Sequence, residues 1–318
     1  MAQISVVIPL YNKAKYVGRA INSVLSQTFH DFEIIVINDA SIDGSEKIVG
    51  QYKDERIKTF NRNTPSPGGH AARNLGIEKA SAELIAFLDA DDEWMPQFLE
   101  TILRLRENYP GAGAYATAYK QKSIHGRIRT PRFWYIPKSR EWEGILPDYF
   151  RSSLYGTTPV WTSAVAIPRE IFASAGFFPE GVPKGGDLDM WARIALKYNI
   201  AYSNHTGAIY HKDVPGSIVR TIRTSGRARV VETVEHFLKG NNDISQLRRQ
   251  YLHEYANKFR ISSAAHCIKA GNIELAVKQL QECHTRKFLC RKTWLYLKIF
   301  LLKYQKQYRK FYKNENSN

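Results

Sequence analysis

The first third of the chain alternates between short apolar runs and segments with helical spacing of apolar residues, and no other feature constrains the fold as strongly. The apolar runs predict strands over residues 4–10, 33–37, 57–60 and 84–88. The segments between and after them predict helices over residues 16–26, 45–52, 70–79 and 95–108. Strands that alternate with helices form a mostly parallel sheet with both faces covered, so the predicted fold class is α/β.

Polar side chains follow three of these strands at the point where each strand ends. Asn12 follows the first strand, Asp39 the second, and Asp89 and Asp91 the fourth. Ligands of such sheets bind at the carboxyl ends of the strands, so we expect these residues to share one site. Alternating carboxylates there are typical of a Mg²⁺ or Mn²⁺ site that leaves positions open for nucleotide phosphates. The alternative is a solvated turn in which Asp92 caps the next helix.

Four segments of the first half occur in an order that indicates a family. They are residues 6–12 (VVIPLYN), 36–45 (VINDASIDGS), 72–76 (ARNLG) and 86–92 (AFLDADD). In order and spacing this set resembles the nucleotide-sugar half of glycosyltransferase family 2, over residues 4 to about 110 and more weakly over 160 to 220. The resemblance implies a GT-A fold, a Rossmann-like and mostly parallel central sheet flanked by helices. It also implies a nucleotide-sugar donor, with UDP the expected nucleotide.

The resemblance assigns a role to each matching residue around the nucleotide. Pro9, Tyr11 and Asn12 would line the pocket for the base and ribose. Asp39 would accept a hydrogen bond from the base, and Arg73 would approach the nucleotide from the following helix.

The resemblance also implies a metal site. Asp89 and Asp91 match the Asp-X-Asp pair of the family, with Asp91 the principal ligand of Mn²⁺ or Mg²⁺ and Asp89 nearer the ribose. Such a cation stabilises the charge that grows on a leaving diphosphate. His211 lies in a segment similar to a loop that closes over the donor phosphates, and would be a third contact to metal or phosphate. The alternative for His211 is a hydrogen-bonded surface histidine.

The second half supplies a candidate for the general base, which takes the proton of the attacking hydroxyl. Residues 184–193 (KGGDLDMWAR) resemble the family segment Gly-Glu-Asp-X-Asp-X-Trp, and its base falls on Asp187. Gly186 stands where glutamate is common in the family. The alternative role of Asp187 is a helix cap, and Asp189 is the second candidate for the base.

The end of the chain is strongly basic. Residues 284–318 hold ten Lys and Arg but one Glu, which gives nine of the sixteen net positive charges. A helix over 294–313 would place one set of apolar residues on a single face: Trp294, Leu297, Leu301, Tyr304, Tyr308 and Phe311. It would place four lysines on the opposite face: Lys303, Lys306, Lys310 and Lys313. A basic amphipathic helix of this kind predicts docking on an anionic membrane surface. The alternatives are a helix packed on its own globule and RNA binding, although no nucleic-acid motif accompanies the charge.

The N-terminus, the apolar runs and the cysteines indicate the cellular location of the protein. The N-terminus has no signal-peptide pattern, and no apolar run reaches the length of a membrane-spanning helix. Cys267, Cys283 and Cys290 lack the paired spacing of a zinc site, which favours packed, reduced thiols over a metal site with His266 or His284. These features predict a cytoplasmic protein held peripherally at the inner face of the membrane.

The sequence thus predicts a nucleotide-sugar-binding half over 1–115, an acceptor-binding and base-bearing half of the same domain over 116–220, and a helical region with a basic tail over 221–318. The predicted function is metal-dependent, inverting transfer of a sugar to a glycan or lipid-linked saccharide in cell-surface polysaccharide or lipopolysaccharide synthesis. The alternative is a catalytically impaired nucleotide-sugar-binding scaffold at the membrane surface. A nucleotidylyltransferase is disfavoured because no Gly-rich phosphate loop with Arg and Lys follows the first strand.

Overall fold

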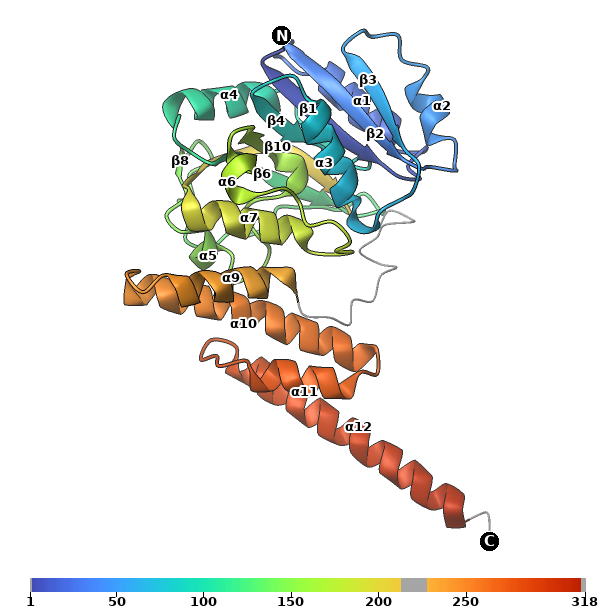
Figure 1. The fold of residues 1–318 in the computed structure, drawn as a ribbon, viewed down its shortest axis with the longest axis vertical. Coiled ribbons are helices and arrows are strands. Elements are labelled where there is room, and N and C mark those ends of the chain that lie inside the picture. The colour runs from blue at the N-terminus through green and yellow to red at the C-terminus, as the bar shows by residue number, and fades with distance from the viewer. Residues whose placement is uncertain (1, 213–227, 316–318) are drawn as a thin grey trace. The chain divides into compact units, whose positions relative to one another are not determined.

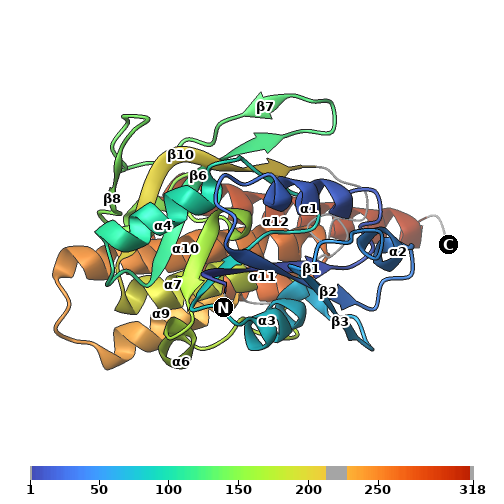
Figure 2. The ribbon, with the colours of Figure 1, turned by 90° about the horizontal axis from the view of Figure 1, so that it is seen from above.

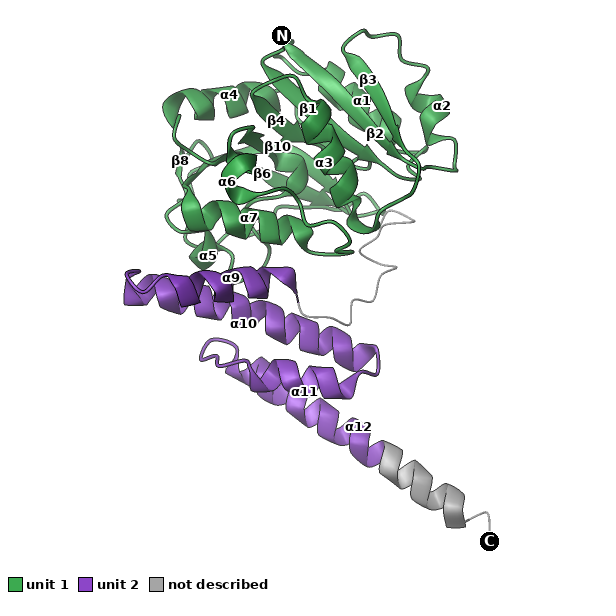
Figure 3. Ribbon diagram, in the orientation of Figure 1, with its two compact units in different colours: residues 1–222 green, residues 223–318 purple. Residues whose placement is uncertain are grey.

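The structure is a computed structural model that describes residues 2–212 and 228–315, and within 306–315 it describes the course of the helix alone. The chain divides into two compact units, residues 1–222 and 223–318 (Figure 3). Each unit is treated by itself below.

The first unit is built on one ten-stranded sheet (Figures 1 and 2). Its main path runs in the order β3-β2-β1-β4-β9-β6-β10-β5, with β7 paired to β6 and β8 to β10. The strands are β1 (Ile4–Leu10), β2 (Phe32–Asp39), β3 (Ile57–Arg62), β4 (Leu84–Phe87), β5 (Glu93–Trp94), β6 (Ala114–Lys122), β7 (Ile128–Arg129), β8 (Glu143–Ile145), β9 (Val165–Pro168) and β10 (Ile200–His211). The first four strands pair in parallel, as the sequence predicts.

Helices cover both faces of this sheet. They are α1 (Val17–Leu25), α2 (Ser45–Val49), α3 (His70–Lys79), α4 (Phe98–Asn108), α5 (Tyr149–Ser152), α6 (Ile171–Ala175) and α7 (Gly186–Lys197). Alternate residues of β1, such as Val6 and Ile8, share a hydrophobic cluster with Ile21 of α1. The opposite face of β1 takes α3, where a Cβ atom on Gly76 would lie 2.3 Å from Val7 Cγ1. A glycine at position 76 therefore lets α3 lie directly on the strand. The two helices flank the parallel strands in Figure 2.

The second half of the sheet is mixed in direction. β9 lies between β4 and β6 and is antiparallel to both, while β10 runs parallel to β6. The α/β class and the N-terminal elements are confirmed, and α3 has the predicted bounds. Helix α4 begins at Phe98 and not at Met95, because residues 93–94 form the short strand β5.

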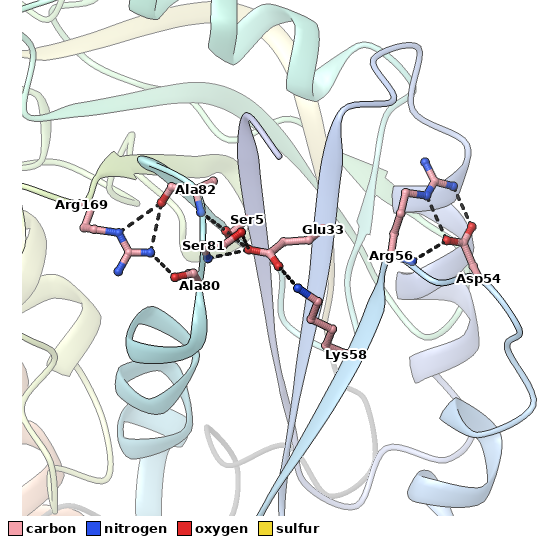
Figure 4. A network of polar contacts seen from close by, with 9 residues as sticks. All are labelled: Ser5, Glu33, Asp54, Arg56, Lys58, Ala80, Ser81, Ala82 and Arg169. Atoms are coloured by element: carbon pink, nitrogen blue, oxygen red, sulfur yellow. Dashed lines mark hydrogen bonds and ion pairs between the residues drawn. The ribbon is translucent and has the colours of Figure 1, made fainter. Parts of the chain in front are cut away.

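A buried carboxylate ties the parallel strands together (Figure 4). Glu33 of β2 accepts hydrogen bonds from Ser5 Oγ at 2.6 Å, Ser81 N at 2.6 Å and Lys58 Nζ at 2.9 Å. Burial opposes ionisation of this group, but the hydrogen bonds from Ser5, Lys58 and Ser81 outweigh burial and lower the pKa of Glu33 to about 2. Nearby, the Arg169 guanidinium donates to the carbonyls of residues 80 and 82, which fixes the end of α3 against β9.

The second unit is helical in the part that the structure describes. Its helices are α9 (Arg229–Gly240), α10 (Gln246–Lys269), α11 (Ile273–Gln281) and α12 (Leu289–Glu315). Cys267 and Cys283 are buried in the hydrophobic cluster of this unit, which confirms the prediction of packed thiols, while Cys290 is exposed. No helix among the described residues is long and apolar enough to cross a membrane.

Helix α12 packs by a face other than the predicted apolar one. Leu295 and Ile299 are buried in the cluster of the second unit. The predicted face is exposed at Trp294, Leu297, Leu301 and Tyr304. The alternative of a helix packed on its own globule is thus confirmed through Leu295 and Ile299, while the predicted apolar face stays exposed. The predicted positions Lys306, Tyr308, Lys310, Phe311 and Lys313 lie outside the described side chains.

Candidate active site

Parallel pairing brings the carboxyl ends of β1, β2 and β4 to one edge of the sheet. Leu10 at the end of β1 pairs with Asn38 of β2, one residue before Asp39. The loops that follow β1 and β2 are joined by Asn12, whose N–H donates to Ser41 Oγ at 3.1 Å and whose Oδ1 accepts from Ile42 N at 2.9 Å. Asn12 has a φ of 50°, in the left-handed region that asparagine tolerates better than most residues. Its side chain thus shapes the loop predicted to line the nucleotide pocket.

Three other predicted pocket residues lie at the same edge. Pro9 pairs with Ile37 in the sheet, and Tyr11 follows it with its ring partly exposed. Asp39 is buried, with Oδ1 bonded to Arg62 and Oδ2 accepting from Ser66 N at 3.0 Å. The structure thus places Asp39 where predicted and gives it protein partners on both oxygens.

Each carboxylate of the Asp-X-Asp pair forms an ion pair with a basic side chain. Arg73 of α3 bonds Asp89 Oδ1 through Nη2, and its Nη1 donates to the carbonyl of Gly68 at 3.1 Å. Lys13 Nζ lies 2.8 Å from Asp91 Oδ2, and both side chains are largely buried. Lys13 was not among the predicted site residues, although a lysine directly after Tyr11 and Asn12 at a strand end was a usable signal.

Asp92 is fully buried behind this pair and does not cap α4, so that alternative is wrong. Its Oδ2 accepts from Ser163 Oγ at 2.5 Å and from Trp161 Nε1 at 3.2 Å, and its Oδ1 accepts from the N–H of His211 at 3.0 Å. Burial, with help from the charges of Asp91 and Asp89, raises the pKa of Asp92 well above the ordinary aspartate value. Asp92 therefore braces the Asp-rich loop against the second half of the sheet.

His211 lies at the end of β10, next to Asp92, but its ring binds another acid. Nε2 lies 3.0 Å from Glu93 Oε1. Burial and the charge of Arg19 lower the pKa of His211 below its ordinary value, although Glu93 opposes them. The structure thus places the predicted metal or phosphate contact beside the loop, engaged with Glu93.

Asp187 stands in the first turn of α7 and is half-buried. Helix α7 takes Gly185 as its N-cap, so Asp187 is not the cap. Burial raises the pKa of Asp187, Arg73 opposes the rise and Asp89 adds to it. The preceding residue, Gly186, lies against His70, whose Nδ1 is 3.4 Å from Arg73 Nη1, so Asp187 lies near the Arg73–Asp89 pair. The second candidate, Asp189, is buried and forms an ion pair with Arg193, Oδ2 to Nε at 2.9 Å.

A buried histidine adjoins this group and was not found from the sequence. His70, the first residue of α3, is buried, and its Nδ1 lies 3.4 Å from Arg73 Nη1. Burial and the Arg73 charge lower the pKa of His70 to about 3, so the ring is neutral at pH 7. In the sequence, His70 has the pattern of an ordinary first residue of a helix, so nothing marked it as a site residue.

Asp89 and Asp91 are the carboxylates of this site that could hold a divalent cation. Among the described residues no three His, Cys, Asp or Glu side chains form a ligand cluster. Asp91 and Asp89 nevertheless offer two adjacent, incompletely buried carboxylates. Mg²⁺ is commonly held by one or two carboxylates together with substrate phosphates, and the residues fit that mode rather than a cage made of protein alone.

Comparisons with known proteins identify the family of the chain. The model of "Glycosyl transferase family 2" matches residues 5–174. A protein of Bacillus subtilis named "Putative teichuronic acid biosynthesis glycosyltransferase TuaG" is 34% identical over 149 residues. These residues are 46% of this chain and 57% of TuaG. A GalNAc(5)-diNAcBac-PP-undecaprenol beta-1,3-glucosyltransferase of Campylobacter jejuni is 37% identical over 106 residues, 33% of this chain and 34% of that protein. The chain spans only 27% to 31% of the length of three further relatives.

A solved structure extends the likeness to the fold. The crystal structure of S. aureus TarS 1-349 in complex with UDP-GlcNAc superposes with a TM-score of 0.68 at 20% identity, covering 89% of this chain and 82% of that chain. This likeness confirms the expected GT-A architecture.

Proposed function

The chain belongs to glycosyltransferase family 2, and on that premise we propose that it is an inverting glycosyltransferase that moves a sugar from a UDP-sugar to a saccharide acceptor. One observation carries the proposal. Asp187 directly follows Gly186, which lies against the ring of His70, and the same ring lies 3.4 Å from Arg73, the partner of Asp89. This is the juxtaposition of a base and a nucleotide site that the reaction requires.

The donor site is the edge formed by the ends of β1 and β2. Pro9, Tyr11 and Asn12 would border the base and ribose, with Asp39 accepting from the base. The TarS structure in complex with UDP-GlcNAc, a protein of the same fold, supports a uridine nucleotide. The buried Arg73 would face the nucleotide from α3.

Asp91, together with Asp89, would hold Mn²⁺ or Mg²⁺ jointly with the diphosphate oxygens. When bound, the cation stabilises the charge that grows on the departing diphosphate. Lys13 holds Asp91 in place at 2.8 Å and contributes a positive charge to the same region. His211 would turn from Glu93 to the metal or phosphate only by giving up its 3.0 Å contact.

Asp187 would act as the general base. The acceptor oxygen forms a bond to C1 as the bond from C1 to the diphosphate oxygen breaks, and the electron pair leaves with UDP. The hydroxyl proton passes to the carboxylate of Asp187, whose raised pKa makes it a stronger base than an ordinary aspartate. Attack from the face opposite the leaving group inverts the configuration at C1.

We further propose that the acceptor is a lipid-linked saccharide and that α12 docks on an anionic membrane. The acceptor class is supported by the relatives named for teichuronic acid biosynthesis and for a PP-undecaprenol substrate. Membrane docking is supported by the exposed apolar residues Trp294, Leu297 and Leu301 beside Lys298 and Lys303. Peripheral attachment of this kind would bring the enzyme to its acceptor.

The test is release of UDP from a panel of UDP-hexoses and UDP-N-acetylhexosamines with Mn²⁺ and a lipid-linked acceptor. Asp187→Asn should bind UDP as the unchanged protein does but release product at least 100-fold more slowly. Asp31→Asn is the matched control, because Asp31 is exposed and precedes β2. Nucleotide binding without turnover by the unchanged protein would favour the scaffold alternative, which Gly186 in place of glutamate motivates.

A further inference from the structure

Helix α3 holds the segment that leads into α7. Asn74 binds both backbone groups of Phe178, with Nδ2 donating to its carbonyl at 2.9 Å and Oδ1 accepting from its N–H at 3.0 Å. Before α3, a Cβ on Gly68 would lie 2.6 Å from the carbonyl oxygen of Val182. The segment that precedes Asp187 is therefore held by α3, the helix that carries Arg73, and it also lies against the turn before that helix.

His70 fills the space between these two segments. Its ring stacks on Phe178 with an interplanar angle of 9° and a centroid distance of 6.0 Å. Arginine can only donate, so the contact at 3.4 Å makes Nδ1 the acceptor from Arg73 and leaves the proton on Nε2. Nε2 has no hydrogen-bond partner and faces Gly186, where a Cβ would lie 2.5 Å from it. That distance is far below any real contact, so the ring and a side chain at position 186 exclude each other.

The backbone conformation at Gly186 does not disfavour a side chain. It lies in the first turn of α7, and its φ is not in the left-handed region. Alanine is a better helix former than glycine by about 1 kcal/mol, so on backbone grounds a substitution there should be tolerated. The ring of His70 thus occupies the room that a side chain at position 186 would need.

We propose that His70 is a positioning residue of this site: its ring wedges against Gly186 and Phe178 and so fixes the first turn of α7, with Asp187, beside Arg73 and Asp89. The assignment of a role to Asp187 rests on the proposed function. The wedge itself is a packing relationship and can be tested without turnover.

The first test is a thermal-unfolding cycle on the full chain with Gly186→Ala, His70→Ala and the double variant. Gly186→Ala should lower Tm by about 3 to 10 °C, because the new methyl group overpacks against the ring. In the His70→Ala background the same change should leave Tm unchanged or raise it, because the ring is gone and helix propensity alone remains. Gly111→Ala is the control, since a Cβ added at Gly111 would meet no atom within 4 Å, and the change should have the same effect in both backgrounds. An equal loss from Gly186→Ala in both backgrounds would overturn the wedge.

The second test is the split between kcat and KM. His70→Ala should lower kcat by about 10-fold or more with little change in donor KM, because it misplaces the base and spares the pocket of Pro9 and Asn12. His70→Phe keeps a ring and should recover most of that kcat, which a role for the nitrogen atoms would not allow. Full kcat in His70→Ala, or no recovery in a stably folded His70→Phe, would overturn the positioning role. No turnover by the unchanged protein would instead reject the proposed function, and the unfolding cycle would still decide the wedge.

Discussion

Arg73 on α3 is bonded to Asp89 beyond β4, and both groups act on the carboxylate of Asp187. The charge of Arg73 favours the ionised form of Asp187, whereas Asp89 and burial disfavour it. Burial is thus the main cause of the raised pKa of Asp187, and the charges of a pair from the nucleotide half of the sheet modify it.

Replacing Arg73 by Met should shift the pH dependence of transfer. Asp187 must be ionised to accept a proton, so the rate falls as the pH drops through its pKa, which already lies above the ordinary value. Loss of the guanidinium removes the opposing charge, and the acid limb of kcat/KM should move to higher pH. Arg73→Lys should keep much of the native profile, and an acid limb in the Met variant at or below its original position would contradict the assignment.

Lys13 and a divalent cation should compete for Asp91. Lys13→Met removes the partner at 2.8 Å, so Mn²⁺ should bind the nucleotide-free protein more tightly, whereas Asp91→Asn should weaken Mn²⁺ binding about 10-fold or more. Titration calorimetry with MnCl₂ measures both effects. Lys15→Met is the matched control because Lys15 is in the same loop without an ion pair to Asp91. Weaker Mn²⁺ binding in a folded Lys13→Met protein would count against a metal at Asp91.

Glu33 should make the first unit sensitive to acid. Its pKa is about 2 in the folded protein against 4.5 in the unfolded chain, so its stabilising contribution is complete above about pH 4.5 and is lost as the pH falls toward 2. Glu33→Gln should lower the free energy of unfolding at pH 7 by roughly 2 kcal/mol and flatten its pH dependence over that window. Urea unfolding at several pH values, with the exposed Glu55→Gln as control, checks this. An undiminished slope between pH 4.5 and 2 in Glu33→Gln would show that other groups dominate.

The exposed face of α12 should carry membrane binding. A triple change of Trp294, Leu297 and Leu301 to Ser should reduce sedimentation with phosphatidylglycerol vesicles about 10-fold or more, because each loses apolar area that would enter the interface. Binding by the unchanged protein should weaken in high salt, as expected where basic residues contact anionic lipid. Leu247→Ser removes an exposed apolar residue of α10 and serves as control. Equal sedimentation of the triple variant would leave the face without a lipid role.

The elements of the first half could be predicted because parallel strands with both faces covered are continuous apolar runs. Helix α3 and strand β1 have the predicted bounds, and the strand ends carry Asn12, Asp39 and Asp89 as expected. The antiparallel insertion of β9 between β4 and β6 was not foreseen, because its pairings join residues about 80 positions apart with β4 and about 50 apart with β6, and no local pattern encodes them.

The roles of individual side chains were harder to predict. Asp92 has the pattern of a turn residue, and only the fold brings Trp161 and His211 to it. His70 and Gly186 are more than 100 positions apart, and their mutual exclusion exists only in three dimensions. On α12 the periodicity identified an apolar face correctly but gave no means to see that Leu295 and Ile299, on another face, are the ones that pack.

The three hydrogen-bond partners of Asp92 become available at different times while the chain is synthesised. Two of its partners come from residues 161–163 and the third is His211, the last residue of β10, so a nascent chain must have emerged through the whole of β10 before all three partners hold this loop. A polypeptide truncated at residue 174, where the family match ends, would lack the last of these attachments. The Asp-rich loop is thus completed late in synthesis, and a prematurely terminated product would present it with one anchor missing.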